Sequence, residues 1–317
     1  MDPVIVIGAG ISGVGCARAL SEAGLAVRVL DRGRRVGGRM ASRSVDGRPV
    51  DIGASYLTAS VPAFVRVVAD WQERGLVHPW TDTFRAISGE GSEDKQGPLR
   101  FGAAAGLRSL VEDLATGLDV ESGYTVERVS DDGNLRVDGV PASAVVLAVP
   151  DPQGARLLDD TLPDERAALK VDFEPVLALI ATCARRSWDL DGAFLNDDPV
   201  LDWVADDGRR RGDGAPVLVA HSSAEFAAQH LSDPDAATGS MVEALRRNLE
   251  VGEPLQVSVH RWTFARPSTG RAELFFLGDR NVGICGDAWS EKPRVEGAYL
   301  SGRALGDALA ARLTGSA

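Results

Sequence analysis

The residues with the clearest chemical meaning lie near the start of the chain. Gly8, Gly10 and Gly13 follow a short apolar run and give the spacing Gly-x-Gly-x-x-Gly. The first glycine permits a tight turn, the second lets the backbone approach a pyrophosphate, and the third lets a helix pack against the preceding strand. Ile11 and Ser12 lie where the free N–H groups of that helix would face the phosphates. These residues predict a dinucleotide-binding turn.

An acidic residue follows at the distance that such a turn requires. Residues 25–30 read as a second buried strand, and Asp31 stands at its end, about twenty positions after the glycines. A carboxylate there is placed to bind the ribose hydroxyls of the nucleotide, and we include its neighbour Arg32 among the contacts. The strand, turn, helix, strand and acid together favour a dinucleotide, but they fit NAD and FAD equally well.

A second turn, Gly37-Gly38-Arg39-Met40, favours FAD. It resembles the second signature of FAD-containing oxidases and desaturases of the amine-oxidase type, in which the arginine approaches the pyrophosphate. Arg39 suits that task because a guanidinium matches phosphate geometry. The resemblance implies cofactor contacts from Gly38, Arg39 and Met40.

The stretch Asp51 to Tyr56 resembles the family segment that passes along the flavin ring. Gly53 and Ala54 are small enough to let a flat ring come close to the backbone, and Ser55 and Tyr56 belong to the same expected contact. Together, GGRMAS, DIGASYLT, VLVAHSS and GDAW…RVEGAYLSGRAL resemble the renalase family, and the resemblance covers most of the chain.

The end of the chain returns to the cofactor. Gly286-Asp287 follows a buried strand and resembles the third FAD signature, with the aspartate near the ribityl chain and pyrophosphate. A helix then begins near Glu296, Gly297 and Ala298, and its positive N-terminal end should face the flavin pyrimidine edge. A stripe of Gly302, Gly306 and Ala310 predicts close packing of this helix. The resemblance further implies that the backbone of Val126 contacts the adenine.

The renalase resemblance implies a non-covalent FAD enzyme. Its substrates would be the 2- and 6-dihydro isomers of NAD(P), oxidised to NAD(P)+ by hydride transfer to the flavin, with O2 reduced to hydrogen peroxide. We name Tyr56, Trp203, His221 and Trp262 as candidates for the substrate slot. His221 also fits a structural part in the core. No residue is assigned a catalytic acid or base role, and no metal site is expected.

Two other functions stay open at this point. One is an FAD-dependent amine oxidase or a desaturase-type dehydrogenase, although such enzymes have longer second domains. The other is a non-catalytic flavin- or nucleotide-binding protein.

The charge and composition of the chain limit the partners that we expect. The chain has 317 residues and a formal net charge of −12, which argues against nucleic acid and anionic membranes as partners. Its three cysteines show no disulfide or zinc pattern. No run approaches the ~20 apolar residues of a membrane span, and no signal peptide is visible, so we expect a cytoplasmic monomer or homodimer.

The pattern predicts an α/β fold with two domains. A Rossmann-like FAD-binding domain, with a parallel sheet and helices, would comprise residues 1–58, 101–152 and 278–317. An α+β substrate domain with a mixed or antiparallel sheet, as in p-hydroxybenzoate hydroxylase and amine oxidases, would comprise 59–100 and 153–277. We also expect helices over 61–73 and 101–118, a loop or turn over 89–97, a hairpin over 124–137, and strands at 176–183, 217–222 and 257–264.

Overall fold

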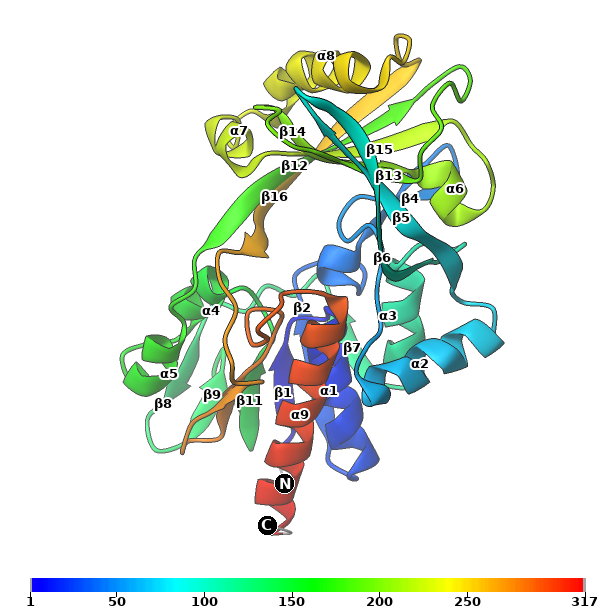
Figure 1. Cartoon of the computed structure of the whole chain (residues 1–317). Helices are drawn as coiled ribbons and strands as arrows, with labels where there is room; N and C mark the ends of the chain where they lie inside the picture. Colours follow the sequence, from blue (N-terminus) through cyan, green and yellow to red (C-terminus); the bar gives the residue numbers. More distant parts are fainter. Residues whose placement is uncertain (1, 316–317) are drawn as a thin grey trace.

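The computed structural model describes residues 2–315, which form two large sheets, joined by several crossings of the chain, and two small ones of two and three strands (Figure 1). The first sheet has six strands in the order β17-β18-β11-β1-β2-β7. These strands are β1 (Val4–Ile7), β2 (Val27–Asp31), β7 (Asp119–Ser122), β11 (Ala144–Leu147), β17 (Phe276–Leu277) and β18 (Val282–Ile284). All pair in parallel except β17 with β18. Strands β1 and β11 are buried throughout, as expected for a parallel sheet covered on both faces.

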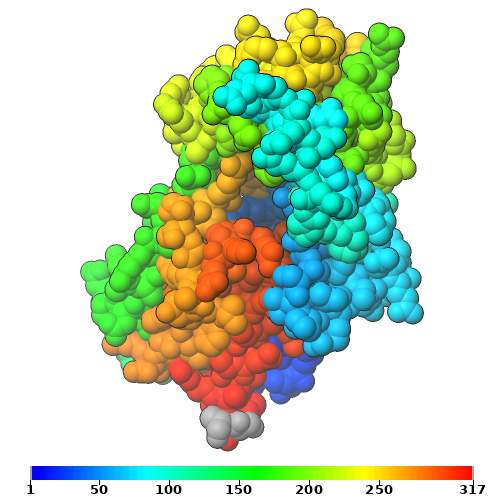
Figure 2. Space-filling view, in the orientation of Figure 1, coloured from blue at the N-terminus to red at the C-terminus, as the bar shows by residue number. Residues whose placement is uncertain are grey.

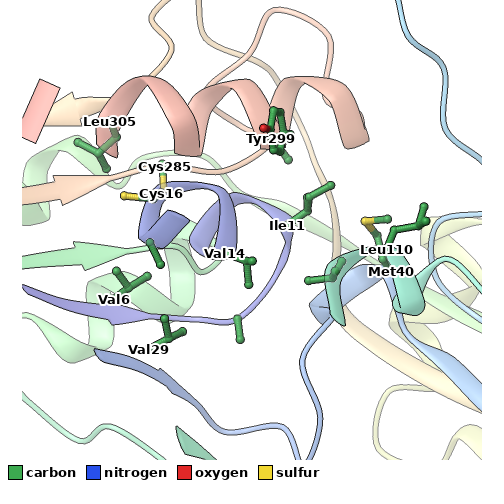
Figure 3. Packing of buried hydrophobic residues seen from close by; sticks show 14 of the residues in the cluster. Val6, Ile11, Val14, Cys16, Val29, Met40, Leu110, Cys285, Tyr299 and Leu305 are labelled. Carbon is green, nitrogen blue, oxygen red and sulfur yellow. The ribbon is translucent and has the colours of Figure 1, made fainter. Parts of the chain in front are cut away.

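Helices α1 (Ile11–Glu22) and α9 (Val295–Thr314) pack against each other beside this sheet (Figure 3). Their contact depends on small residues: a Cβ added at Gly302 would lie 1.9 Å from the carbonyl oxygen of Ser12, and one at Gly306 would lie 2.6 Å from the Ala19 Cβ. The predicted small-residue stripe is therefore confirmed as a packing surface. Cys16 and Cys285 are buried free thiols within the same core.

The second sheet has seven strands in the order β16-β12-β15-β14-β13-β5-β6. Its members are β5 (His78–Ser88), β6 (Gly91–Gly102), β12 (Phe173–Thr182), β13 (Gly192–Leu195), β14 (Leu201–Asp206), β15 (Val217–Ser222) and β16 (Gln256–Pro267). Only β13 and β5 pair in parallel, so the sheet is mixed, as predicted. One face packs under α8 (Thr238–Leu249) through Leu177, Leu179 and Leu218. The opposite face is turned toward the first sheet (Figure 1).

The smaller elements complete the two layers. They are α2 (Pro62–Glu73), α3 (Arg108–Ala115), α4 (Asp151–Leu157), α5 (Pro163–Ala168), α6 (Asp207–Arg211), α7 (Ala224–Gln229), the 3-10 turns η1 (Gly38–Met40) and η2 (Pro234–Ala237), and the short strands β3 (Ser42–Val45), β4 (Arg48–Asp51), β8 (Val129–Asp131), β9 (Leu135–Val137) and β10 (Val140–Pro141). None of the helices between residues 2 and 315 combines the length and the apolar character needed to cross a bilayer.

Three local predictions were wrong in part. The helix expected over 101–118 is only α3, because residues 101–102 still belong to β6. The polar stretch 89–97 is mostly strand, since β6 begins at Gly91. Because β6 is the edge strand of its sheet, charged exposed side chains suit it and hide its strand character in the sequence. In the hairpin expected over 124–137, residues 124–128 are irregular and pairing starts at β8.

Candidate active site

The turn after β1 is closed by backbone packing. Gly8 has a φ of +107°, and a Cβ at Gly13 would lie 1.9 Å from the Gly8 carbonyl oxygen. Gly10 is different, because a Cβ built there meets nothing within 4 Å. Two of the glycines are thus required by the fold itself, whereas the middle one leaves open space beside the start of α1, where the motif would place a pyrophosphate.

The start of α1 also holds an unsatisfied polar group. Ser12 is 6% exposed, and its Oγ has no hydrogen-bond partner among residues 2–315. Gly10, at the N-cap position, provides no side-chain cap for the helix. A buried hydroxyl and free N–H groups at a helix N-terminus fit the pyrophosphate of a dinucleotide. Ile11, at the first helical position, is buried.

Asp31 lies at the end of β2, next to this turn. Its Oδ2 accepts a hydrogen bond from the Ala9 N–H at 2.5 Å, and its Oδ1 accepts one from the Gly33 N–H at 2.6 Å. These bonds fix the carboxylate at the edge of the turn, and its remaining lone pairs could accept ribose hydroxyls. Arg32 is exposed.

The second and third predicted signatures meet. Arg39 forms two parallel hydrogen bonds with the Asp287 carboxylate, both 2.7 Å long, and a third with the Ala265 carbonyl at 3.1 Å. The guanidinium is therefore held by protein groups, and it links η1 to the segment after β18. A Cβ at Gly38 would lie 3.1 Å from the Gly10 Cα, so η1 lies directly against the turn after β1. We call this turn, residues 8–13, the pyrophosphate turn, after the group that its motif is predicted to bind. Met40 is buried in the core.

The stretch 51–56 runs beside η1. The Ala54 N–H donates to the Arg39 carbonyl at 2.8 Å, and a Cβ at Gly53 would lie 1.9 Å from the same oxygen. Any side chain at position 53 would push these segments apart. The close approach that the sequence predicted for Gly53 is thus made by the protein backbone in this structure.

The seven-stranded sheet covers this stretch and brings the four predicted slot residues together. Trp262 Nε1 donates to the Ile52 carbonyl at 2.8 Å, and Trp203 Nε1 donates to Ser55 Oγ at 3.0 Å. Trp203 and His221 are paired across β14 and β15. The rings of Trp203 and Tyr56 have centroids 6.1 Å apart.

Two further aromatic residues, which the sequence analysis missed, extend this surface. Trp80 and Phe84 on β5 have ring centroids 6.3 and 5.3 Å from that of Tyr56. We call the surface formed by Tyr56, Trp80, Phe84, Trp203, His221 and Trp262 the aromatic wall. Phe84 and Trp203 are buried, whereas the other four keep part of their surface exposed. The segment HPWTDTF could have indicated it, since Trp80 and Phe84 differ by an even number of strand positions.

Figure 2 shows a hollow between the two sheets. Cyan and teal residues of the β5–β6 region border it on one side, and orange residues from the last fifth of the chain border it on the other. Blue residues from the N-terminal part are visible inside. The hollow therefore lies between the β5–β6 region, which carries Trp80 and Phe84, and the N-terminal part of the chain, which carries the first cofactor signatures.

His221 is neutral at ordinary pH. Burial lowers the pKa of its imidazole from 6.5 to about 3, and the charges of Arg266 and Arg210 act in the same direction. Only the backbone of Ile52 acts against them. Its Nε2 has no hydrogen-bond partner among the described residues. A neutral imidazole with a free ring nitrogen can orient a ligand by a hydrogen bond without adding charge to the site.

A buried ion network, also missed from the sequence, holds the stretch 51–56 under the sheet. Arg210 on α6 is fully buried, donates to the Ser55 carbonyl at 2.9 Å, and pairs with Asp207. Arg211 pairs with Asp207 and with Asp51, at 3.1 and 3.0 Å. Burial alone would raise the pKa of Asp207, but the charges of Arg210 and Arg211 outweigh it and hold that pKa well below its usual value.

The side chain of Glu296, at the start of α9, binds protein groups. Glu296 is 1% exposed, and its carboxylate accepts hydrogen bonds from the N–H groups of Ser60 and Val61, at 2.6 and 2.7 Å. It also pairs with Arg294. This carboxylate stabilises the start of α2. A contact of Glu296 with the cofactor stays a prediction and would involve its backbone.

The remaining predicted contacts lie close to the same region. A Cβ at Gly297 would lie 2.4 Å from Ser290 Oγ, and Ala298 is buried in the first turn of α9. The Gly286 N–H donates to Ser301 Oγ at 3.0 Å. Val126 is buried against the strands of the six-stranded sheet. Contact of these residues with FAD stays a prediction.

Two family models match the chain. Residues 6–71 match a model described as NAD(P)-binding Rossmann-like domain, and residues 67–308 match one described as flavin containing amine oxidoreductase. Polyamine oxidase 4 of Oryza sativa subsp. japonica is 57% identical over 54 residues, which are 17% of this chain and 11% of that protein.

Solved structures show the same fold. Cyclohexylamine oxidase from Brevibacterium oxydans aligns over 99% of both chains with a TM-score of 0.79 and 12% identity. Putrescine oxidase bound to putrescine also aligns over 99% of both chains, with a TM-score of 0.73 and 18% identity. With the two sheets, these matches confirm the predicted fold class: a Rossmann-like nucleotide-binding part joined to a mixed sheet. The exact domain boundaries stay a prediction.

Proposed function

Because the chain belongs to the family of flavin-containing amine oxidoreductases, an FAD-dependent class, we propose that it oxidises a carbon–hydrogen bond next to nitrogen. The expectations of FAD as cofactor and of an oxidoreductase are confirmed by this membership. Bound FAD would supply the hydride acceptor for this oxidation, and O2 would take up the electrons to give hydrogen peroxide. The nitrogen lone pair forms the C=N bond as the C–H bond breaks.

The observation that carries the proposal is the arrangement of the aromatic wall. Trp262 and Trp203 are hydrogen-bonded to the stretch 51–56, which passes beside η1 and the pyrophosphate turn. The rings of Tyr56, Trp80 and Trp203 are inclined to one another, and their electron-rich faces can hold a planar or cationic nitrogen group close to the acceptor. Orientation of this kind, without a side-chain acid or base, is sufficient for hydride transfer.

Two substrate classes contain the required bond. In an amine it is the carbon bearing the amino group, and the comparisons favour this class, because the relatives named above are oxidases of polyamines, putrescine and cyclohexylamine. In the 2- and 6-dihydro isomers of NAD(P) it is the ring carbon beside the ring nitrogen. The resemblance to renalases motivates this second candidate, and the N–H donors beside Tyr56, described below, favour it.

Anaerobic mixing of the yellow holoprotein with candidate reductants tests the proposal. Putrescine, spermidine and benzylamine represent the amines, and 6-dihydroNAD represents the nucleotides. The matched control is 4-dihydroNAD, whose reactive carbon is not bonded to nitrogen. We expect bleaching of the flavin by members of one of the two classes, faster than by 4-dihydroNAD. If dithionite bleaches the flavin but every amine and 6-dihydroNAD leave it yellow, the proposed activity is wrong.

A further inference from the structure

Arg100, on β6, is a buried arginine whose donor atoms are only partly satisfied by the fold. The side chain is 8% exposed, and neither Nε nor Nη1 has a hydrogen-bond partner among residues 2–315. Its guanidinium carbon lies 3.8 Å from the Phe84 ring centroid and 5.7 Å from that of Tyr56. Stacking on an aromatic ring stabilises a cation, but it leaves the N–H donors of the guanidinium plane without acceptors, which is costly when they are buried.

A second donor in the same cluster is also unpaired. Trp80 Nε1 is buried without a partner in the described part of the chain, and its ring lies 5.4 Å from that of Phe84. Asp82 on the same hairpin accepts hydrogen bonds from Gln96 at 2.9 Å and from Thr83 at 2.8 Å, and these bonds lower its pKa more than the charge of Arg100 does. Asp82 therefore does not satisfy the free guanidinium atoms. Three donor nitrogens in the cluster around Tyr56 therefore have no acceptor among residues 2–315.

We propose that Arg100, with Trp80, forms a subsite that binds an oxyanion of the substrate, a carboxylate or a phosphate, at the Tyr56 end of the aromatic wall. Charge-assisted hydrogen bonds from a guanidinium to such groups are short and strong, and burial strengthens them further. This inference rests on the proposed function, because it places the anionic end of the molecule whose C–H bond is oxidised. It predicts an anionic amine or a nucleotide in preference to a simple polyamine.

The proposed subsite should select substrates by the sign of their charge. A polyamine would bring a second positive charge toward Arg100, and like charges in a partly buried site repel. An amine that also carries a carboxylate, or a dihydronicotinamide with its phosphates, would instead satisfy the free donors. A site that is built to hydrogen-bond one group discriminates strongly against analogues that lack it, since its own polar groups are then left unpaired.

Binding can be tested without turnover by titrating the holoprotein and recording the shift of the visible flavin spectrum. The probes share one ring: benzoate and phenyl phosphate carry an oxyanion, benzamide is neutral, and benzamidine is cationic but has no hydrogen on the carbon bonded to its nitrogens, so it cannot be oxidised as an amine. We expect an oxyanion probe to bind at least about tenfold more tightly than benzamide, as one charge-assisted bond allows. Benzoate and phenyl phosphate separate the carboxylate source from the phosphate source. Equal binding of benzoate, phenyl phosphate and benzamide, or tighter binding of benzamidine, overturns the subsite.

Variants then assign the preference to a residue. Arg100→Met should abolish the preference for benzoate over benzamide, and Arg100→Lys should keep part of it. The matched control is Arg85→Met on the neighbouring strand, because Arg85 is paired with Asp94 at 2.9 Å, and this variant should leave the preference unchanged. Persistence of the full preference in Arg100→Met refutes the assignment. The ratio is measured within one variant, so a general loss of FAD or stability does not imitate it.

The outcome is separable from that of the proposed function. If no amine or dihydronicotinamide bleaches the flavin but benzoate still binds through Arg100, the activity is wrong and the subsite is correct. If bleaching occurs but the probes show no preference for the oxyanion, the activity stands and the subsite is overturned.

Discussion

The pyrophosphate turn and the aromatic wall are built in opposite ways. The turn consists of backbone, and its glycines all lie within residues 8–13. The wall consists of side chains from β5, β14, β15 and β16 and from the stretch 51–56, which are up to about two hundred positions apart. The first is specified by local steric needs and the second by the register of a sheet. The proposed cofactor site thus depends on a local motif, whereas the proposed substrate surface depends on the whole fold.

The largest effects should come from the glycines of the turn, which divide into two kinds. Gly13→Val should prevent stable folding, because even a Cβ would overlap the Gly8 carbonyl. Gly10→Val should fold, since a Cβ there meets nothing within 4 Å, but it should weaken FAD binding by about 100-fold or more, or about 2.8 kcal/mol. Thermal unfolding by circular dichroism and titration with FAD measure the two effects.

Two outcomes would contradict the predictions for Gly10 and Gly13. A Gly10→Val protein that co-purifies with a full complement of FAD would show that the pyrophosphate lies elsewhere. A well-folded Gly13→Val protein would show that the contact with Gly8 is not required.

A smaller but still large effect is expected where the sheet is anchored to the stretch 51–56. Arg210→Met leaves Asp207 with one buried partner fewer and removes the bond to the Ser55 carbonyl. Breaking a buried ion pair from one side costs about 3–5 kcal/mol. Urea denaturation should show that loss. Arg209→Met is the matched control: Arg209 pairs with Asp189 and Asp191 at the surface, where such pairs contribute about 0–1 kcal/mol. Equal losses in the two variants would contradict the network.

The smallest effect concerns His221 and pH. Its folded pKa of about 3 lies below the ordinary value of 6.5. Between these values the unfolded chain binds a proton that the folded chain does not, so His221 lowers the free energy of unfolding as pH falls through this window, and has no such effect above it. In NMR spectra, the imidazole signal that is lost in His221→Gln should not titrate between pH 5 and 8. A midpoint near 6.5 would place His221 in solvent.

The same comparison explains what the sequence could predict. Three features were predictable because each meets a local steric or hydrogen-bonding requirement: the glycine spacing, Asp31 and the small-residue stripe on α9. Trp203, His221 and Trp262 could be named only as candidates, since strand register decides whether they meet. Arg100 and Arg210 were missed because arginine in a charged segment is usually exposed; their burial follows from the pairing of β5 with β6 and from the position of α6. Glu296 illustrates the reverse, as a carboxylate expected near the cofactor stabilises a neighbouring helix.

The separation of the proposed cofactor site from the aromatic wall is tested most directly by the affinity for FAD of three apoproteins: wild type, Gly10→Val and Arg100→Met. Isothermal titration calorimetry with FAD measures all three. We expect Arg100→Met to bind FAD within about threefold of wild type, a difference under 1 kcal/mol, and Gly10→Val to lose most of its affinity for FAD. If Arg100→Met loses as much FAD affinity as Gly10→Val, the wall is part of the cofactor site and the separation proposed here is wrong.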